Sequence, residues 1–396
     1  MATRGRRNRR RPLAEAESED HGPVPNKQKI QSSATELVGG SSTVNTGTEE
    51  RAAKDPRREL PTVMKPKDQQ TAECVASSRD KALVRDVARS IVSVCPVGLD
   101  RNVMHQCTGF LIGWNETKKC ARILTSFRAI RGLDPKTKVC LPNKTVFEGQ
   151  VLFFNVHYNI ALLEISSIAD LPLELPSFGS NPNYGQEVFV LARGEESNLM
   201  ARHGAILWFD KSDLLGRNYH MFLSCKIPAG ANGGPVVDHN GDVVGMAFFG
   251  GSPQPTILSI STIRTCIEMW MKFSRIARPA HGLHLRTVEL LEVSLQEMMS
   301  LDHNINSGYI VDKVSVNSAA GRLGIRYGDV IVSIDGLHVH TLPQLEDYLL
   351  SLGWGFLQGS IDSSSMVELK LEVYDLLEHN TRSIILPVEF CDASET

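Results

Sequence analysis

The sequence contains no long apolar segment: within its 396 residues, no run approaches the ~18 apolar residues that a membrane-spanning helix requires. Its N-terminus also has no apolar stretch of the kind found in secretory signals. These absences predict a soluble, intracellular protein in the nucleus or cytoplasm. A plastid location is less favoured, because "EAESED" makes the N-terminal segment too acidic for a transit peptide.

The eight cysteines include no C-x-x-C pair, the spacing typical of zinc or redox sites. We therefore expect reduced, mostly buried thiols and no metal or cofactor. The formal net charge is only −3, so the chain as a whole carries no broad field that would attract nucleic acid or membranes. Partners must be inferred from local features.

Residues 1–84 read as a disordered charged tail, because they show neither helical nor strand periodicity and contain few apolar residues. Six arginines fall within residues 4–11. Such a cluster is typical of nuclear-import signals and of phosphate-binding segments, although a solvated charge run has the same composition.

From about residue 85 the sequence changes to short apolar runs separated by turn residues, such as "SIVSVCPV", "CTGFLIGW" and "EVFVLA". Strands at this spacing without intervening helices predict a β-barrel or sandwich. The segment "STIRTCIEMWMKF" then places Ile263, Ile267, Trp270 and Met271 at helical intervals, which predicts one amphipathic helix at the end of an all-β domain.

The segment "ARPAHG", residues 277–282, has the proline and glycine expected of a hinge. Beyond it, strand and helix patterns alternate and predict a compact α+β domain over residues 281–390. Its best-defined helix begins at Thr341, with Gln344 in a capping box, and is expected to end at Gly353.

The loop "PAGANGGPVVD" has the glycine pattern of a turn that presents a nucleophile. Gly230 and Gly233 allow the backbone to direct N–H groups toward one point, where the oxyanion of an acyl-transfer reaction would lie. The position that would carry the hydroxyl is Asn232. We therefore assign Gly230, Asn232 and Gly233 as an oxyanion-hole-like group.

These motifs resemble the Deg/HtrA serine proteases, in which a trypsin-like double β-barrel is followed by a PDZ domain. Residues 85–276 look like the protease domain and residues 281–390 like the PDZ domain. The resemblance places Arg128 at the histidine of the catalytic triad, Asn159 at the aspartate and Asn232 at the serine. It implies a mainly β fold, and co-assembly into homo- or hetero-oligomers such as trimers.

The matching segments are "ILTSFRAI" around Arg128, "NIALLEI" around Asn159 and "NSAAGRLGIRYGDVIVSIDG" in the PDZ-like part. In chemical terms, an asparagine amide is no nucleophile, and an arginine guanidinium does not give up its proton in a protein. The neutral Asn159 would not stabilise a charged base. The sequence therefore predicts a pseudoprotease, a serine protease homologue that does not cut.

The alternative is an active serine-type endopeptidase with an unrecognised catalytic group, such as Cys225 with His157 or His105. A binding role is predicted instead for the PDZ-like domain, which would take protein C-termini or extended peptides along an edge strand. The segment that resembles its carboxylate loop contains Gly282, Leu283, His284 and Leu285. His284 and His340 would make such binding sensitive to pH.

Nucleic acid is a weaker candidate partner, through the arginine cluster of residues 4–11. If the cluster contacts phosphates, the full chain should be retained on DNA at low salt and released as salt rises, because binding depends on counterion release. Deleting residues 1–12 should abolish that retention in a DNA-affinity assay. Retention that survives the deletion would assign DNA binding to another part of the chain.

Overall fold

The computed structural model of the protein describes residues 56–96, 106–130, 136–166, 172–194, 197–208, 217, 219–249, 254–338, 341–359 and 366–392. The chain divides into two units, Met1–Met64 and Lys65–Thr396. The first contains the 3-10 helix η1 (Pro56–Glu59), and the sections below concern the second. The arginine cluster lies outside the described residues. Within those ranges, no helix is both long and apolar enough to cross a membrane.

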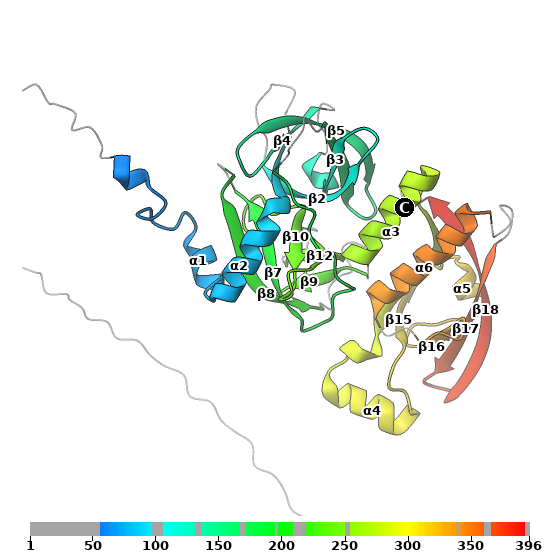
Figure 1. Ribbon diagram of the computed structural model, residues 1–396. Coiled ribbons are helices and arrows are strands. Elements are labelled where there is room, and N and C mark those ends of the chain that lie inside the picture. Colours follow the sequence, from blue (N-terminus) through cyan, green and yellow to red (C-terminus); the bar gives the residue numbers. More distant parts are fainter. Residues whose placement is uncertain are drawn as a thin grey trace, which may run out of the picture. The chain divides into compact units, whose positions relative to one another are not determined.

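Two closed β-barrels follow one another along the chain, each built from apolar runs that the sequence pattern marked as strands (Figure 1). The first has the order β1-β2-β3-β6-β5-β4 and consists of β1 (Ile91–Pro96), β2 (Cys107–Asn115), β3 (Cys120–Ser126), β4 (Lys136–Cys140), β5 (Val146–Asn155) and β6 (Ile160–Ser166). The second has the order β10-β11-β12-β9-β8-β7 and consists of β7 (Glu187–Arg193), β8 (Leu199–Leu207), β9 (Met221–Leu223), β10 (Gly234–Val237), β11 (Val243–Phe248) and β12 (Thr256–Ser259).

The helix α3 (Ile260–Phe273) ends the second barrel, as the periodicity predicted. Its N-cap is Ser259, whose hydroxyl accepts a hydrogen bond from the N–H of Ser261. Ile263 and Ile267 are buried, but Met271 is 42% exposed, so the predicted apolar face was wrong at that residue.

A six-stranded sheet with helices forms the C-terminal domain, in the order β13-β18-β17-β16-β15-β14. Its strands are β13 (Ala277–Ala280), β14 (Leu283–Thr287), β15 (Tyr309–Val314), β16 (Val330–Ile334), β17 (Val367–Asp375) and β18 (Asn380–Asp392), and its helices are α4 (Val293–His303), α5 (Ala319–Arg322) and α6 (Leu342–Leu357). Short 3-10 turns elsewhere in this unit are η2 (Ala88–Ser90), η3 (Phe127–Ala129) and η6 (Val288–Leu290).

The predicted hinge over residues 277–282 is wrong for its first four residues, which form β13 and pair with β18. The proline that suggested a hinge, Pro279, is tolerated because β13 lies at the edge of the sheet. The C-terminal sheet therefore begins directly after α3, without a free linker.

The cap of α6 was predicted correctly, because Thr341 and Gln344 form a full capping box. The predicted stop at Gly353 was wrong, and the helix continues to Leu357. Gly353 serves close packing instead: a Cβ at this position would lie 1.9 Å from the carbonyl oxygen of Ala277. The missing side chain lets α6 approach β13, and α6 also packs beside α3 (Figure 1).

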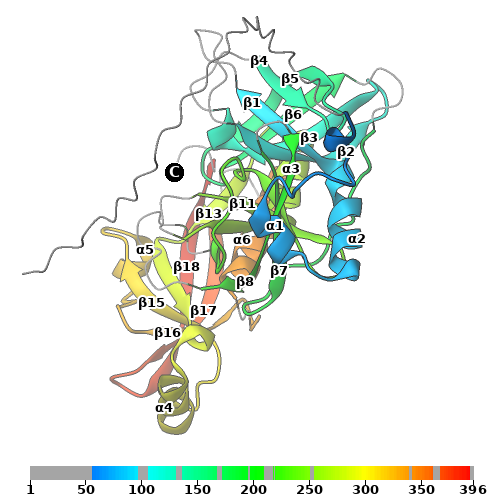
Figure 2. The same ribbon diagram turned by 90° about the vertical axis from the view of Figure 1, so that its left-hand side faces the viewer.

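The predicted tail, residues 1–84, was too long. Helix α1 (Gln69–Cys74) lies within this segment, and helix α2 (Ser78–Val87) extends past its end. α1 packs against β8 (Figure 2). The docking rests largely on polar contacts that periodicity does not reveal. Asp68 accepts a hydrogen bond from Arg202 at 2.6 Å, and the hydroxyl of Thr71 accepts one from the N–H of Ala201 at 2.9 Å.

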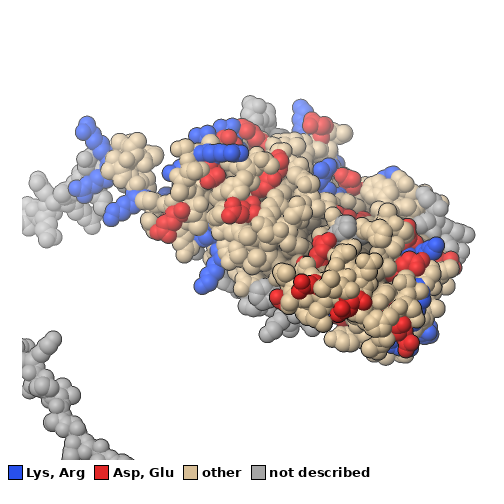
Figure 3. Space-filling view, turned by 90° about the horizontal axis from the view of Figure 1, so that it is seen from below, with Lys and Arg blue, Asp and Glu red and all other residues tan. Residues whose placement is uncertain are grey.

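The burial of the cysteines agrees only in part with the expectation of mostly buried thiols. All eight cysteines are free thiols, three of them buried and five partly buried. On the face drawn in Figure 3, the acidic and basic side chains of the described residues are interspersed and form no continuous basic patch.

Candidate functional site

The glycine-rich turn before β10 is held between the two barrels. Gly230 and Gly233 have left-handed φ angles of +83° and +85°, which glycine adopts without strain. A Cβ on Gly233 would lie 2.4 Å from the carbonyl oxygen of Thr108 in the first barrel. Thr108 in turn donates from its N–H to the Asn232 carbonyl at 2.9 Å and from its hydroxyl to the Gly230 carbonyl at 2.7 Å. The sequence thus forms the turn that the glycine pattern predicted.

Asn232 and Arg128 meet at one peptide segment, Phe249, directly after β11. The Asn232 side-chain oxygen accepts a hydrogen bond from the Phe249 N–H at 2.8 Å. The Arg128 guanidinium donates to the Phe249 carbonyl at 2.7 Å. Arg128 of the first barrel and Asn232 of the second barrel therefore form hydrogen bonds with the carbonyl and the N–H of the same residue.

Asn159 lies beneath the turn η3 that carries Arg128. Its side-chain oxygen accepts from the Ser126 hydroxyl at 3.1 Å and from the Arg128 N–H at 3.3 Å, and its own carbonyl accepts from the Phe127 N–H at 3.1 Å. It is buried and has a φ of +54°, a conformation that asparagine tolerates better than most residues. Asn159 thus orients the backbone of the turn rather than a catalytic base.

The structure thus brings together the three residues that the sequence resemblance assigned to a triad: Arg128 is hydrogen-bonded to Asn159, and Arg128 and Asn232 both contact Phe249. The side chains of Asn232 and Arg128 themselves supply neither a nucleophile nor a base for acyl transfer, because one is an amide and the other a guanidinium. A carboxylate at the third position would have stabilised a protonated histidine, whereas the amide of Asn159 accepts hydrogen bonds without carrying charge.

The predicted oxyanion-hole-like group is partly occupied. The Gly233 N–H donates to the Ala247 carbonyl at 2.9 Å, so it is not available to an anion. Among the hydrogen bonds between described residues, none uses the N–H of Gly230 or of Asn232. These two groups remain candidates for holding a carbonyl or carboxylate oxygen.

Two of the alternative catalytic groups, Cys225 and His157, lie among the described residues and pack against other parts of the fold. Cys225 packs against Gly204 of β8, and burial raises the pKa of its thiol to about 11, which keeps it protonated near neutral pH. His157 packs on the rings of Tyr158 and Tyr219 at 4.8 and 5.8 Å. His105 lies outside the described residues.

A second candidate site lies between the edge strand β14 and helix α6, where PDZ domains receive a peptide strand. A cavity of about 40 Å³ opens there. Its lining includes Leu283 and Leu285 from the predicted carboxylate segment, together with apolar residues Leu342, Leu345 and Leu349 of α6 and polar residues Tyr219, Arg278, His281 and Glu346. Gly282 and His284 flank Leu283 in the same segment, and His340 lies outside the described residues.

His281 covers one of the backbone donors in this segment. Its Nδ1 accepts a hydrogen bond from the Leu283 N–H at 3.2 Å. Burial, together with the nearby charge of Arg278, lowers the pKa of His281 to about 3, so the imidazole is neutral at physiological pH and keeps its acceptor. Sequence reasoning missed this contact, because only the fold of the segment aims the ring at its neighbour.

Glu346 joins the C-terminal domain to the barrels. It is 2% exposed and accepts hydrogen bonds from Arg278 at 2.6 and 2.9 Å and from the Tyr158 hydroxyl at 2.5 Å. Burial alone would raise the pKa of Glu346, but the charge and hydrogen bonds of Arg278 outweigh it and hold the pKa below its usual value. Its neighbour Asp347 accepts from Asn181 at 2.8 Å and Thr262 at 2.7 Å.

Comparisons with known proteins agree with this architecture. The trypsin-like peptidase domain family matches residues 107–246, and the PDZ domain family matches residues 310–353. "Putative protease Do-like 14" of Arabidopsis thaliana is 30% identical over 227 residues, which cover 55% of this chain and 53% of that protein. "Serine protease HTR4" of Bos taurus is 26% identical over 286 residues, covering 66% and 56%.

The chain thus spans about half the length of the curated relatives it matches. Among solved structures, "HtrA-type protease AlgW with tripeptide" is similar with a TM-score of 0.54 at 14% identity, over 80% of this chain and 98% of that one, which supports the fold. The two barrels, the glycine-rich turn and the C-terminal sheet define a trypsin-like peptidase domain followed by a PDZ domain. The two matching domain families and the similarity to Do-like and HtrA proteins support a Deg/HtrA-like relationship for this chain.

The neutral state of His281 predicts a pH dependence of stability. The unfolded chain takes up a proton near pH 6.5, whereas the folded chain does so only at about pH 3. The stability contributed by neutral His281 is therefore complete above about pH 6.5 and is lost as the pH falls toward 3, by up to about 1.4 kcal/mol per pH unit. Denaturant unfolding at pH 7, 6 and 5 measures this loss.

His281→Asn is the matched variant, because the asparagine oxygen can accept the Leu283 N–H without titrating. We expect its stability to fall less steeply than that of the parent chain between pH 7 and 5. His284→Asn, which changes a neighbouring histidine, should keep the parental slope. Equal slopes for the parent and His281→Asn would show that His281 does not titrate in this window.

Proposed function

We propose that this protein is a catalytically inactive member of its family, a pseudoprotease that binds protein segments and does not cut them. The proposal rests on one observation: Arg128 and Asn232 are engaged with the backbone of Phe249. Arg128 is unable to accept a proton and Asn232 has no group that forms an acyl intermediate, so the serine-type route lacks both its base and its nucleophile.

We expect no labelling by a serine-directed fluorophosphonate probe and no digestion of casein, with trypsin as the positive control. Asn232→Ser restores a hydroxyl but not a base, so it should stay unlabelled as well. The triple variant Arg128→His, Asn159→Asp, Asn232→Ser tests whether the scaffold still supports the missing groups. Labelling of the unmodified chain, or an acyl adduct within residues 85–276, would establish the active-endopeptidase alternative.

We further propose that the groove between β14 and α6 binds the C-terminus of a partner protein. β14 is the edge strand of its sheet, which is the position where PDZ domains add a peptide strand. Leu283, Leu285 and Leu345 supply an apolar wall for the last side chain of a peptide. His281 and the Arg278–Glu346 pair also line the groove, so the bound peptide must displace the ring of His281 to reach the Leu283 N–H.

This groove should prefer peptides with a free C-terminal carboxylate and an apolar last residue. We expect amidation of the peptide to weaken binding about tenfold or more, because the hydrogen bonds to a charged carboxylate are lost. Fluorescence anisotropy with paired free and amidated peptides measures the difference. His281→Ala should tighten binding several-fold by uncovering the Leu283 N–H, while His379→Ala, on the turn between β17 and β18, should leave it unchanged. Equal affinities for the free and amidated peptides would exclude carboxylate recognition.

The resemblance to Deg/HtrA proteins also supports co-assembly with related chains, and the arginine cluster supports a nuclear or cytoplasmic location. Co-assembly would extend the proposed binding role, because a subunit that does not cut can still position partners for an active neighbour.

A further inference from the structure

The second barrel gathers two histidines and a glutamate that the triad positions do not involve. Glu187 begins β7, His203 lies in β8, and His239 lies in the turn between β10 and β11. In the ladder of β7 and β8, His203 is opposite Phe189, two residues from Glu187, so the side chains of His203 and Glu187 lie on the same face. β10 pairs with β7 at Val237 and Phe189, which brings His239 beside Glu187.

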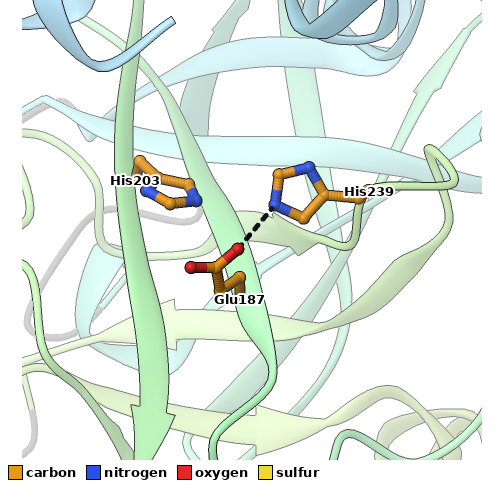
Figure 4. Close-up of side chains that lie close together, drawn as sticks. All are labelled: Glu187, His203 and His239. Carbon is orange, nitrogen blue, oxygen red and sulfur yellow. Dashed lines mark ion pairs between the residues drawn. The ribbon is translucent and has the colours of Figure 1, made fainter.

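The donor atoms of this cluster converge. One nitrogen of each histidine and one carboxylate oxygen of Glu187 all lie within 4.8 Å of one another. Figure 4 shows the three side chains pointing toward a common point, with His239 Nε2 lying 3.7 Å from a Glu187 oxygen. His239 Nε2 is buried and makes no hydrogen bond among the described residues.

The surrounding residues orient both rings. Phe189 packs against His203 and against His239, each with ring centroids 5.0 Å apart. On the other side of His239, an Asp80 oxygen from α2 lies 3.6 Å from Nδ1. Asp80 is itself held by the Ser77 hydroxyl at 2.7 Å. A carboxylate behind one ring nitrogen and a ligand site at the other is the arrangement that orients histidines bound to metals.

We propose that Glu187, His203 and His239 bind one Zn²⁺ ion, with Asp80 as the outer partner of His239. Two imidazole nitrogens and one carboxylate oxygen are a known ligand set for zinc, and the fourth tetrahedral position would be filled by water. Donors bound at about 2.0–2.2 Å lie roughly 3.4 Å apart, so the side chains need only close by an ångström or so from their present positions. The Glu187 side chain is 66% exposed and that of His239 is 40% exposed, so an ion can reach them from solvent.

The ion would join three segments that are distant in sequence: the strands β7 and β8, the turn after β10 and, through Asp80, the helix α2. Because Zn²⁺ would bind the folded chain and not the unfolded one, it should raise the thermal midpoint in proportion to its affinity. The sequence alone did not reveal this site, since its ligands are far apart and follow no zinc motif.

The test uses the full chain, stripped with a chelator, and measures Zn²⁺ binding by calorimetry with Mg²⁺ as the comparison ion. We expect one Zn²⁺ per chain and a rise in the melting temperature that Mg²⁺ does not produce. Glu187→Gln, on an exposed side chain, should weaken binding by more than tenfold without changing the metal-free melting temperature. Asp80→Asn should weaken it about tenfold, the effect expected for an outer partner.

A double variant, His203→Gln with His239→Gln, should abolish specific binding, whereas the matched changes Glu378→Gln and His379→Gln should leave the affinity unaltered. Because the chain has eight free thiols, Co²⁺ absorption provides the decisive readout. Weak visible bands without an intense thiolate charge-transfer band would support the nitrogen and oxygen ligands. A thiolate band, or equal affinities for the parent chain and Glu187→Gln, would overturn the proposal.

Discussion

Hydrogen bonds to the backbone of one residue, Phe249, link the two barrels at the candidate site, and one of them comes from the exposed side chain of Arg128. Arg128 reaches across to the Phe249 carbonyl, and Asn232 takes the adjoining N–H. Both barrels are thereby tied through one peptide segment. The glycines of the turn are still required, because Gly233 lies too close to Thr108 for any side chain. The shape of the loop therefore depends on its glycines and its backbone contacts.

The buried Glu346 imposes a second constraint, on the relation between the peptide groove and the barrels. A carboxylate in such a position is tolerated only with full pairing, which Arg278 and Tyr158 provide. Removing one partner would leave an uncompensated charge at a cost of about 3–5 kcal/mol. Because Glu346 also lines the groove, the groove and the domain contact share one helix face. A peptide bound in the groove, as proposed, would therefore contact the same carboxylate that joins the domain to the barrels.

Much of the fold was predictable from local pattern. The alternating strands, the helix α3 and the Thr341 capping box follow from spacing and cap chemistry. Errors arose where tertiary packing overrides a local signal. A glycine such as Gly353 is typical of a helix stop, but here it allows close approach to Ala277. A proline such as Pro279 is typical of a hinge, but here it lies in an edge strand. The docking of α1 through Asp68 and Arg202 depends on long-range hydrogen bonds, which periodicity does not report. The candidate site was also predictable only in part. Sequence motifs pointed to Arg128, Asn159 and Asn232. The contacts with Phe249, the position of His281 and the proposed zinc ligands could be found only in the folded structure, because their residues are distant in sequence or are oriented by the fold.

The proposed replacement of all three triad positions would have an evolutionary consequence. Members of a triad act as a unit, so restoring one of them while the others are absent gains almost nothing. Arg128 also donates to the Phe249 carbonyl, and exchanging it for histidine would give up that hydrogen bond. On this proposal, single substitutions toward a triad would bring no gain in hydrolysis, and selection would act on the contacts that the scaffold already makes.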